Sequence, residues 1–202
     1  MLGAFVRAFR TPDLRNKLLF TIFILTIFRL GSVIPAPGID SAAIREQLET
    51  VQAADESGIY SLINLFSGGA LLQLAVFALG IMPYITASII INLLTVVIPR
   101  LADLKKEGQA GQTKITQYTR YLTLALAVLQ STSFIAMARS GQLFQGRIPV
   151  HTYMPNDDLL TLITMVFTMT AGTAVIMWFG ELITERGVGN GMSLLIFTQV
   201  IA

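Results

Sequence analysis

The sequence predicts an all-α protein that crosses a membrane several times. Of its 202 residues, 53% are hydrophobic and only 13% are charged, whereas an average soluble domain has ~25% charged residues. The mean hydropathy is +0.67, and the apolar residues stand in long blocks rather than in short periodic groups. Long apolar blocks with few charges are typical of membrane-spanning helices. We therefore expect a polytopic helical membrane protein with five spans.

The first span is predicted at 17–34. Basic residues precede its apolar run, and Pro35-Ala36-Pro37-Gly38 ends it, because proline and glycine interrupt helices. Arg29 lies inside this span, close to its end, where we expect the side chain to reach the interface. A cleaved signal peptide is the alternative interpretation, but no small-residue cleavage site follows at a suitable distance.

Residues 57–99 contain no Asp, Glu, Lys, Arg or His. As one straight helix this stretch would be about 65 Å long, roughly twice the ~30 Å hydrocarbon core. Gly68-Gly69 offers a break, so we expect a short helix at 60–72 and a full span at 74–98, which Pro83 can kink. The short helix is either a re-entrant element or an interfacial helix, and the pattern leaves both open.

The remaining spans are predicted at 118–138, 159–179 and 191–202. Polar segments at 100–117, 139–158 and 180–190 separate them, and Asp157-Asp158 is expected to cap the fourth span. The last span is roughly 18 Å long, too short for the hydrocarbon core. We therefore expect the chain to be one piece of a longer protein.

The distribution of Lys and Arg predicts the orientation. Only Arg45, Arg139 and Arg147 fall on one face of the membrane, while ten basic residues fall on the other. Cytoplasmic loops carry the excess of positive charge, so the N-terminus is expected in the cytoplasm. The ten are Arg7, Arg10, Arg15, Lys17, Arg100, Lys105, Lys106, Lys114, Arg120 and Arg186.

No arrangement typical of an enzyme is found. The predicted spans contain no Asp or Glu, which disfavours proton-coupled transport, and the chain has no cysteine. His151, the single histidine, has no partner at metal-ligand spacing. Glu181, Glu185 and Arg186 are interpreted as a solvated charge set on a turn. We therefore predict no catalytic residue, no metal and no cofactor.

The second and third predicted spans carry uncharged polar side chains. Thr86, Asn92 and Gln130 are expected to be buried. They either form interhelical hydrogen bonds, worth about 0.6 kcal/mol each, or line a hydrated seam between helices that can part. One face of the second span is predicted to hold Ile81, Ile85, Ser88 and Asn92, at i, i+4, i+7 and i+11.

Five stretches of the chain are long and specific motifs: RLGSVIPAPGI (29–39), FSGGAL (66–71), FALGIMPYITASIIINLLTVVIP (77–99), LKKEGQAGQTKITQYTRY (104–121) and MWFGELITERGVGNGMSLLIF (177–197). They resemble the SecY family, the channel subunits of the bacterial Sec translocase. The resemblance covers nearly the whole chain in order and is weakest in the outer loops at 40–58 and 139–158.

This resemblance implies the first half of a ten-span channel built from two pseudo-symmetric halves. The implied function is to pass unfolded secretory proteins across the plasma membrane and to release membrane segments sideways into lipid. The implied partners are the SecE and SecG membrane subunits, the SecA ATPase motor, the ribosome, signal sequences with their nascent secretory polypeptides, the lipid bilayer, and the C-terminal half of the same channel.

The resemblance also implies three groups of site residues. A hydrophobic pore ring, which gates by excluding water, would include Ile81, Ile85, Met192 and Ile196. Met192 departs from the isoleucine that the family favours. The polar part of a lateral gate would include Thr86, Asn92, Gln130 and Asn190. A plug that blocks the closed pore would comprise Asn64, Leu65, Phe66, Ser67, Gly68, Gly69, Ala70, Leu71 and Leu72.

Two other functions are compatible with part of this pattern. Half of an inverted-repeat small-solute transporter would explain a broken helix near a binding site. Such a site needs convergent polar groups, and the apolar constriction expected at Ile81 and Ile85 supplies none. A structural membrane scaffold would explain neither the broken helix nor the plug-like segment.

Overall fold

A computed structural model describes residues 11–44, 46, 74–144, 148–156 and 158–201. Within these ranges the chain is helical and forms no strand, apart from one isolated antiparallel bridge between Pro35 and Ala75. The elements are α2 (Pro12–Gly31), α5 (Met82–Val97), α6 (Pro99–Lys106), α7 (Gln109–Arg139), η1 (Gln142–Phe144), α8 (Val150–Tyr153), α9 (Leu159–Arg186) and α10 (Gly191–Ile201).

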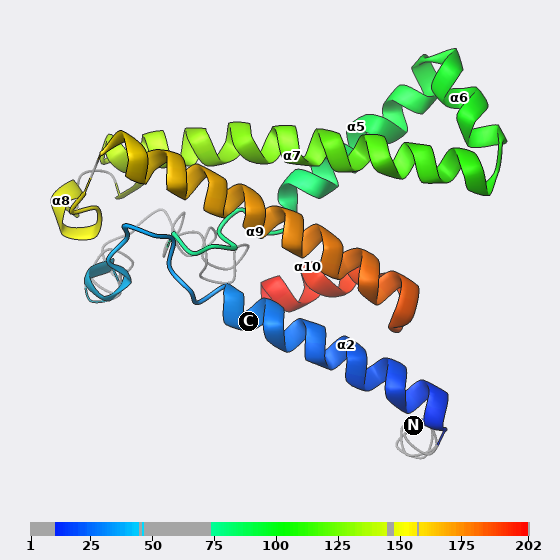
Figure 1. Cartoon of the computed structure of the whole chain (residues 1–202), viewed down its shortest axis with the longest axis horizontal. Helices are drawn as coiled ribbons and strands as arrows, with labels where there is room; N and C mark the ends of the chain where they lie inside the picture. The colour runs from blue at the N-terminus through cyan, green and yellow to red at the C-terminus, as the bar shows by residue number, and fades with distance from the viewer. Residues whose placement is uncertain (1–10, 45, 47–73, 145–147, 157, 202) are drawn as a thin grey trace.

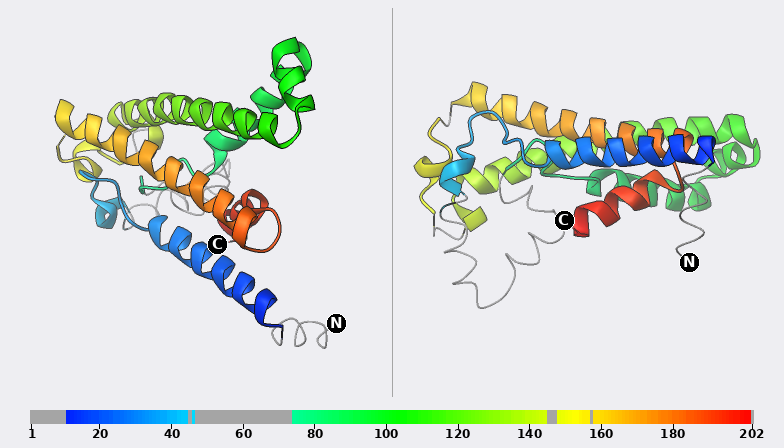
Figure 2. Two further views of the ribbon diagram at one scale, coloured as in Figure 1. Left: turned by 45° about the vertical axis from the view of Figure 1, so that its right-hand side comes forward. Right: turned by 90° about the horizontal axis from the view of Figure 1, so that it is seen from below.

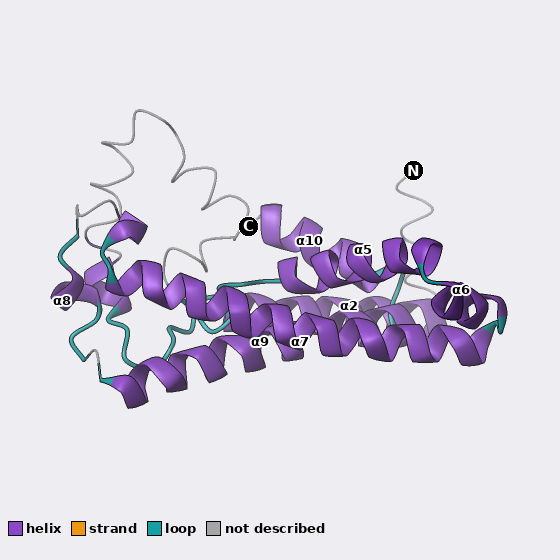
Figure 3. Ribbon diagram, turned by 90° about the horizontal axis from the view of Figure 1, so that it is seen from above, coloured by secondary structure: helices purple, strands orange, loops and turns teal. Residues whose placement is uncertain are grey.

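Two long helices, α7 and α9, form the centre of the molecule (Figure 1). The helix α7 packs against α5 on one side and α9 on the other, and α9 also contacts α2 and α10. Figure 3 shows α2, α5, α7 and α9 running lengthwise in roughly one direction. The short helix α6 turns away from the others at one end (Figure 2, left).

The helix of the second predicted span begins at Met82 rather than at Leu74. Residues 74–81 form turns instead, tied by two 2.9 Å hydrogen bonds, from Val76 N–H to the Ile34 carbonyl and from Ala36 N–H to the Leu74 carbonyl. Pro83 lies in the first turn of α5. Proline is compatible with that position because no intrahelical N–H is needed there, so Pro83 starts the helix and the expected kink is wrong.

The polar segment predicted at 100–117 is mostly helical. It holds α6 and the beginning of α7, which starts at Gln109 rather than near Tyr118. The axes of α5 and α6 differ by 100° across Ile98. Since Pro99 is the first residue of α6, its ring ends the α5 hydrogen-bond ladder and starts a new helix. Sequence polarity marked the end of the apolar block but not the end of the helical backbone.

The fourth predicted span continues as a helix to Arg186, so the polar turn expected at 180–190 is shortened to 187–190. Gly180 and Gly191 allow α9 and α10 to approach closely, because a Cβ on Gly191 would lie 2.0 Å from the Gly180 carbonyl oxygen. Asp158 stands at the N-cap of α9, but its side chain makes no capping hydrogen bond. Asp157 lies outside the described residues.

Within the described residues, α7 and α9 are long and apolar enough to cross a membrane, and the bent pair α5–α6 would be a third span. The helix α10 is apolar but shorter. The predicted boundaries of five spans therefore stay a prediction from the sequence.

The helices enclose two hydrophobic clusters. The first, cluster A, joins the end of α7 to the start of α9 through Met165, Met169 and the residues around Tyr153. Burial raises the pKa of the Tyr153 hydroxyl, which donates a hydrogen bond to the Ala138 carbonyl. The second, cluster B, consists of Ile24, Phe28, Phe77, Ile81, Ile176, Phe179, Ile183 and Leu195. Residues 74–81 contribute side chains to both clusters.

Candidate functional site

Three of the four predicted pore-ring residues lie in cluster B or pack against it. Ile81, the N-cap of α5, is 2% exposed within it. Ile85 and Met192 are partly buried and pack against it from α5 and α10. Ile196 is 37% exposed and lies outside the cluster. The structure therefore brings the start of α5 and the start of α10 to one apolar centre supported by α9.

The position of Met192 is fixed by its contact with α9. A Cβ on Gly180 would lie 2.3 Å from the Met192 sulfur, so a side chain at this position would displace the Met192 thioether. The Thr184 hydroxyl accepts a 2.9 Å hydrogen bond from Gly191 N–H and donates one of 2.8 Å to the Gly180 carbonyl. These contacts hold the first turn of α10 against the last turns of α9.

Asn190 caps α10. Its Oδ1 accepts hydrogen bonds from the N–H groups of Met192 at 3.0 Å and Ser193 at 3.3 Å. An N-cap side chain satisfies donors that the first helical turn leaves without partners. Asn190 thus orients the helix that carries Met192 and Ile196, a role that the sequence analysis did not foresee.

Thr21 links α2 to this same turn. Its hydroxyl accepts a 3.2 Å hydrogen bond from Val188 N–H and donates one of 2.9 Å to the Lys17 carbonyl. Thr21 is buried, so the bond is sheltered from solvent. The helix α2 is therefore attached to the turn before α10, 167 residues further along the chain.

The predicted gate residues are not buried polar groups in this structure. Thr86 and Gln130 are partly exposed, and Asn92 and Asn190 are exposed. The Thr86 hydroxyl donates to the Met82 carbonyl of its own helix at 3.0 Å. In the described part of the chain no hydrogen bond joins any two of the four. Thr86, Asn92 and Gln130 are thus not buried as expected, because the described elements of this chain do not fully cover the faces of α5 and α7 that carry them.

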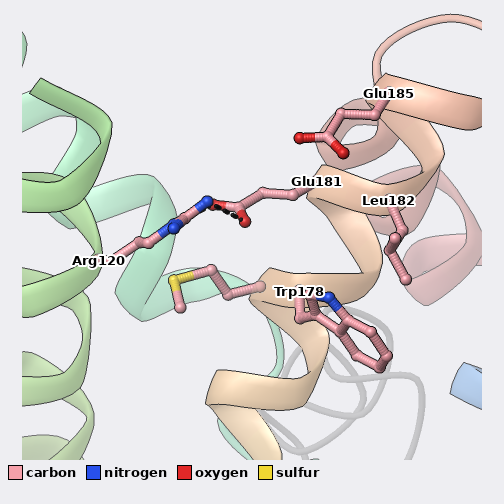
Figure 4. Close-up of a pocket in the computed structure, with 6 residues that line it drawn as sticks. Arg120, Trp178, Glu181, Leu182 and Glu185 are labelled. Carbon is pink, nitrogen blue, oxygen red and sulfur yellow. Dashed lines mark hydrogen bonds and ion pairs between the residues drawn. The ribbon is translucent and has the colours of Figure 1, made fainter. Parts of the chain in front are cut away.

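A charged pair that the sequence analysis missed connects α7 to α9. The Arg120 guanidinium donates two hydrogen bonds to the Glu181 carboxylate, Nε to Oε1 at 2.8 Å and Nη2 to Oε2 at 2.7 Å. Figure 4 shows the two side chains reaching toward each other. The Glu181 side chain is only 16% exposed and that of Arg120 is 43% exposed. Glu181 is thus not part of a solvated turn.

One sequence signal could have indicated this pair. Arg120 lies within the predicted span 118–138, and a cation inside a span requires a partner or water. Glu181 is a suitable partner only because α9 continues beyond Phe179. The short predicted helix concealed that possibility.

A pocket of about 320 Å³ lies beside this pair. Its lining includes Trp178, Leu182 and Glu185; Figure 4 shows Trp178 and Leu182 pointing away from the pair. Tyr84, near the start of α5, interacts electrostatically with both Arg120 and Glu181. The pair is therefore a junction of three helices, close to the end of α5 that carries Ile81 and Ile85.

The remaining predictions concern the plug, His151 and metal binding. The plug residues 64–72 lie outside the described residues. His151 is exposed on α8. Among the described residues, no group of three or more His, Cys, Asp or Glu could hold a metal ion.

The fold and the apolar spans together define a polytopic helical membrane protein. A family model described as SecY matches residues 75–202. The chain belongs to the SecY family.

Two curated relatives illustrate the similarity. The "Protein translocase subunit SecY" of Streptomyces scabiei is 62% identical over 202 residues, which cover 100% of this chain and 46% of that protein. The protein of the same description from Mycobacterium tuberculosis strain H37Rv is 55% identical over 203 residues and is covered to 45%. The chain therefore spans about half the length of the curated relatives it matches.

A solved structure supports the fold. "Sec61 in the Canine ribosome-channel complex from the endoplasmic reticulum" matches with a TM-score of 0.58 and 15% sequence identity, covering 93% of this chain and 36% of the other. At this identity the match concerns the fold alone, and it agrees with the all-helical channel fold predicted from the sequence.

Proposed function

We propose that this chain forms the N-terminal half of the central pore subunit of a Sec protein-conducting channel. The observation that carries the proposal is the 62% identity along the entire chain to a translocase subunit of about twice its length. The channel passes unfolded secretory proteins across the plasma membrane and releases membrane segments sideways into lipid. The small-solute transporter weighed above is not favoured by this family membership.

The pore ring is proposed at Ile81, Ile85, Met192 and Ile196. Support comes from cluster B, which contains Ile81 and against which Ile85 and Met192 pack. Bulky aliphatic side chains at a constriction exclude water and ions, and hydrophobic constrictions gate by dewetting. The plug is proposed at 64–72, on sequence resemblance alone.

The lateral gate is proposed to include Thr86, Asn92, Gln130 and Asn190. The exposure of the first three on α5 and α7 is compatible with surfaces that meet another helical half. A signal sequence would enter between these surfaces, and its apolar segment would move from the channel interior into the surrounding lipid.

We place the N-terminus in the cytoplasm, because the basic residues favour that side by ten to three. The chain is proposed to act without catalysis and without a cofactor. SecA or a translating ribosome would supply the driving force, and SecE, SecG and the C-terminal half of the channel would complete the assembly.

Site-specific photocrosslinking tests the proposal. A photoreactive residue is placed at Ile85 of the full-length channel, and a secretory polypeptide is stalled midway through the membrane. We expect a crosslink to the polypeptide that is lost when its signal sequence is inactivated. A probe at Leu129, which is exposed on α7 and outside cluster B, serves as the control. Export without any crosslink at Ile85 would show that the path lies elsewhere.

A further inference from the structure

The turn between α9 and α10 is held from two sides by threonine hydroxyls. On the α9 side, Gly191 N–H donates a 2.9 Å hydrogen bond to the Thr184 hydroxyl. On the α2 side, Val188 N–H donates one of 3.2 Å to the Thr21 hydroxyl. Both N–H groups stand shortly before Met192, the first proposed ring position on α10.

Each of the two hydroxyls is oriented by a second hydrogen bond, made within its own helix. Thr184 donates to the Gly180 carbonyl at 2.8 Å, and Thr21 donates to the Lys17 carbonyl at 2.9 Å. A hydroxyl has one proton and two acceptor lone pairs. Because the proton is directed to a carbonyl of the same helix, the lone pairs remain available for the N–H groups of the turn. Each threonine is therefore an acceptor of fixed orientation.

The backbone of this turn also approaches both helices closely. A Cβ on Gly187 would lie 2.6 Å from the Thr21 hydroxyl oxygen, and one on Gly191 would lie 2.0 Å from the Gly180 carbonyl oxygen. The helix α10 contacts both α9 and α2 (Figure 1). A movement of the first turn of α10 away from α9 would therefore break the hydrogen bond to Thr184.

We propose that Thr184 and Thr21 are positioning residues for the pore ring, which hold the start of α10 so that Met192 stays packed against cluster B in the closed channel. Met192 packs against that cluster from α10. A hydrophobic constriction excludes water only while its side chains remain close together. Loss of either hydroxyl would let the first turn of α10 move and widen the constriction. The inference rests on the proposed pore function.

The ion conductance of the full-length channel in planar bilayers tests the proposal. Thr184→Val keeps the branched shape of the side chain and removes the hydroxyl. We expect the resting conductance to rise about fivefold, because the loss of one hydrogen bond shifts a two-state equilibrium by about that factor. Thr21→Val should also raise the conductance. Thr184→Ser keeps the acceptor oxygen and should show the wild-type value.

Thr168→Val is the matched control. Thr168 also lies on α9, and its hydroxyl donates a 2.7 Å hydrogen bond to the Thr164 carbonyl of the same helix. This substitution should leave the resting conductance unchanged. An equal rise in Thr168→Val or in Thr184→Ser would overturn the proposal, as would wild-type conductance in Thr184→Val. Wild-type conductance in Thr21→Val would overturn the attachment from two sides.

Amide hydrogen exchange separates this proposal from the proposed channel function. Thr184→Val should accelerate exchange at Gly191, and Thr21→Val should accelerate it at Val188. The substrate crosslink at Ile85 should be retained in both variants. Faster exchange with unchanged conductance would show that the hydroxyls hold the turn but not the ring, which overturns this proposal alone. A missing crosslink at Ile85 in the wild type would instead contradict the proposed channel path.

Discussion

The bidentate pair of Arg120 and Glu181 is the strongest polar contact between α7 and α9 in the described part of the chain. Removing one partner of a sheltered ion pair leaves the other charge without compensation. Since Arg120 is 43% exposed, solvent reduces the effect. We expect Glu181→Gln to lower the free energy of unfolding by about 1–2 kcal/mol, measured by thermal unfolding of the full-length channel in detergent.

Glu185→Gln is the control for that substitution, because Glu185 is exposed one turn further along α9. Its effect should stay within about 0.5 kcal/mol. Equal destabilisation by both substitutions would mean that net charge, rather than the paired geometry, determines the stability of this junction.

Asn190 allows a capping role to be separated from a gating role. Asn190→Ala should cost about 1 kcal/mol and accelerate amide exchange at Met192 and Ser193, whose N–H groups it binds. Asn190→Asp keeps the acceptor oxygen and should protect both amides. Asn190→Asp can also change how hydrophobic a signal sequence must be for the channel to accept it. In that case the side-chain NH2 group of Asn190 has a second role, in the gate.

At the scale of elements, the crossing of residues 74–81 over α9 depends on Gly172. A Cβ there would lie 2.2 Å from the Val76 carbonyl oxygen, and backbone cannot move aside as a flexible side chain can. Gly172→Ala should therefore force the two segments apart and destabilise the protein by about 1–3 kcal/mol. The measurement is thermal unfolding of the full-length channel.

Ala171→Val is the control, because Ala171 lies on the exposed side of the same helix. It should lower the free energy of unfolding by about 0.5 kcal/mol. A similar loss of stability in both variants would contradict the steric explanation.

The same elements show which features the sequence could predict. The apolar blocks located α7 and α9, because length and hydropathy are local properties. The turns at 74–81 gave no signal, since a buried irregular segment is as apolar as a buried helix. The pairing of Arg120 with Glu181 spans 61 residues and depends on how α7 packs against α9. The burial of Ile81 likewise depends on α2, α9 and α10 together.

At the scale of the whole molecule, cluster B joins the first described helix, α2, to the last, α10. It contains side chains from α2, α9, α10 and the segment before α5. The residues proposed for the ring therefore rest on elements from both ends of the chain. Enlarging or removing one of these side chains should affect the seal of the closed channel as well as local packing.

Ile85→Gly tests this seal. Deleting the side chain removes an apolar barrier, and a wider, wetter constriction should pass ions. We expect a higher resting conductance of the full-length channel in planar bilayers.

Ile90→Gly is the matched control. Ile90 is partly buried on α5 and faces about 140° away from Ile85. Its replacement by glycine has the same helix-propensity cost of about 1 kcal/mol. A similar rise in both variants would indicate that a weakened α5 leaks, and would remove Ile85 from the ring. A rise in Ile85→Gly alone would assign the barrier to the face of α5 that packs against cluster B.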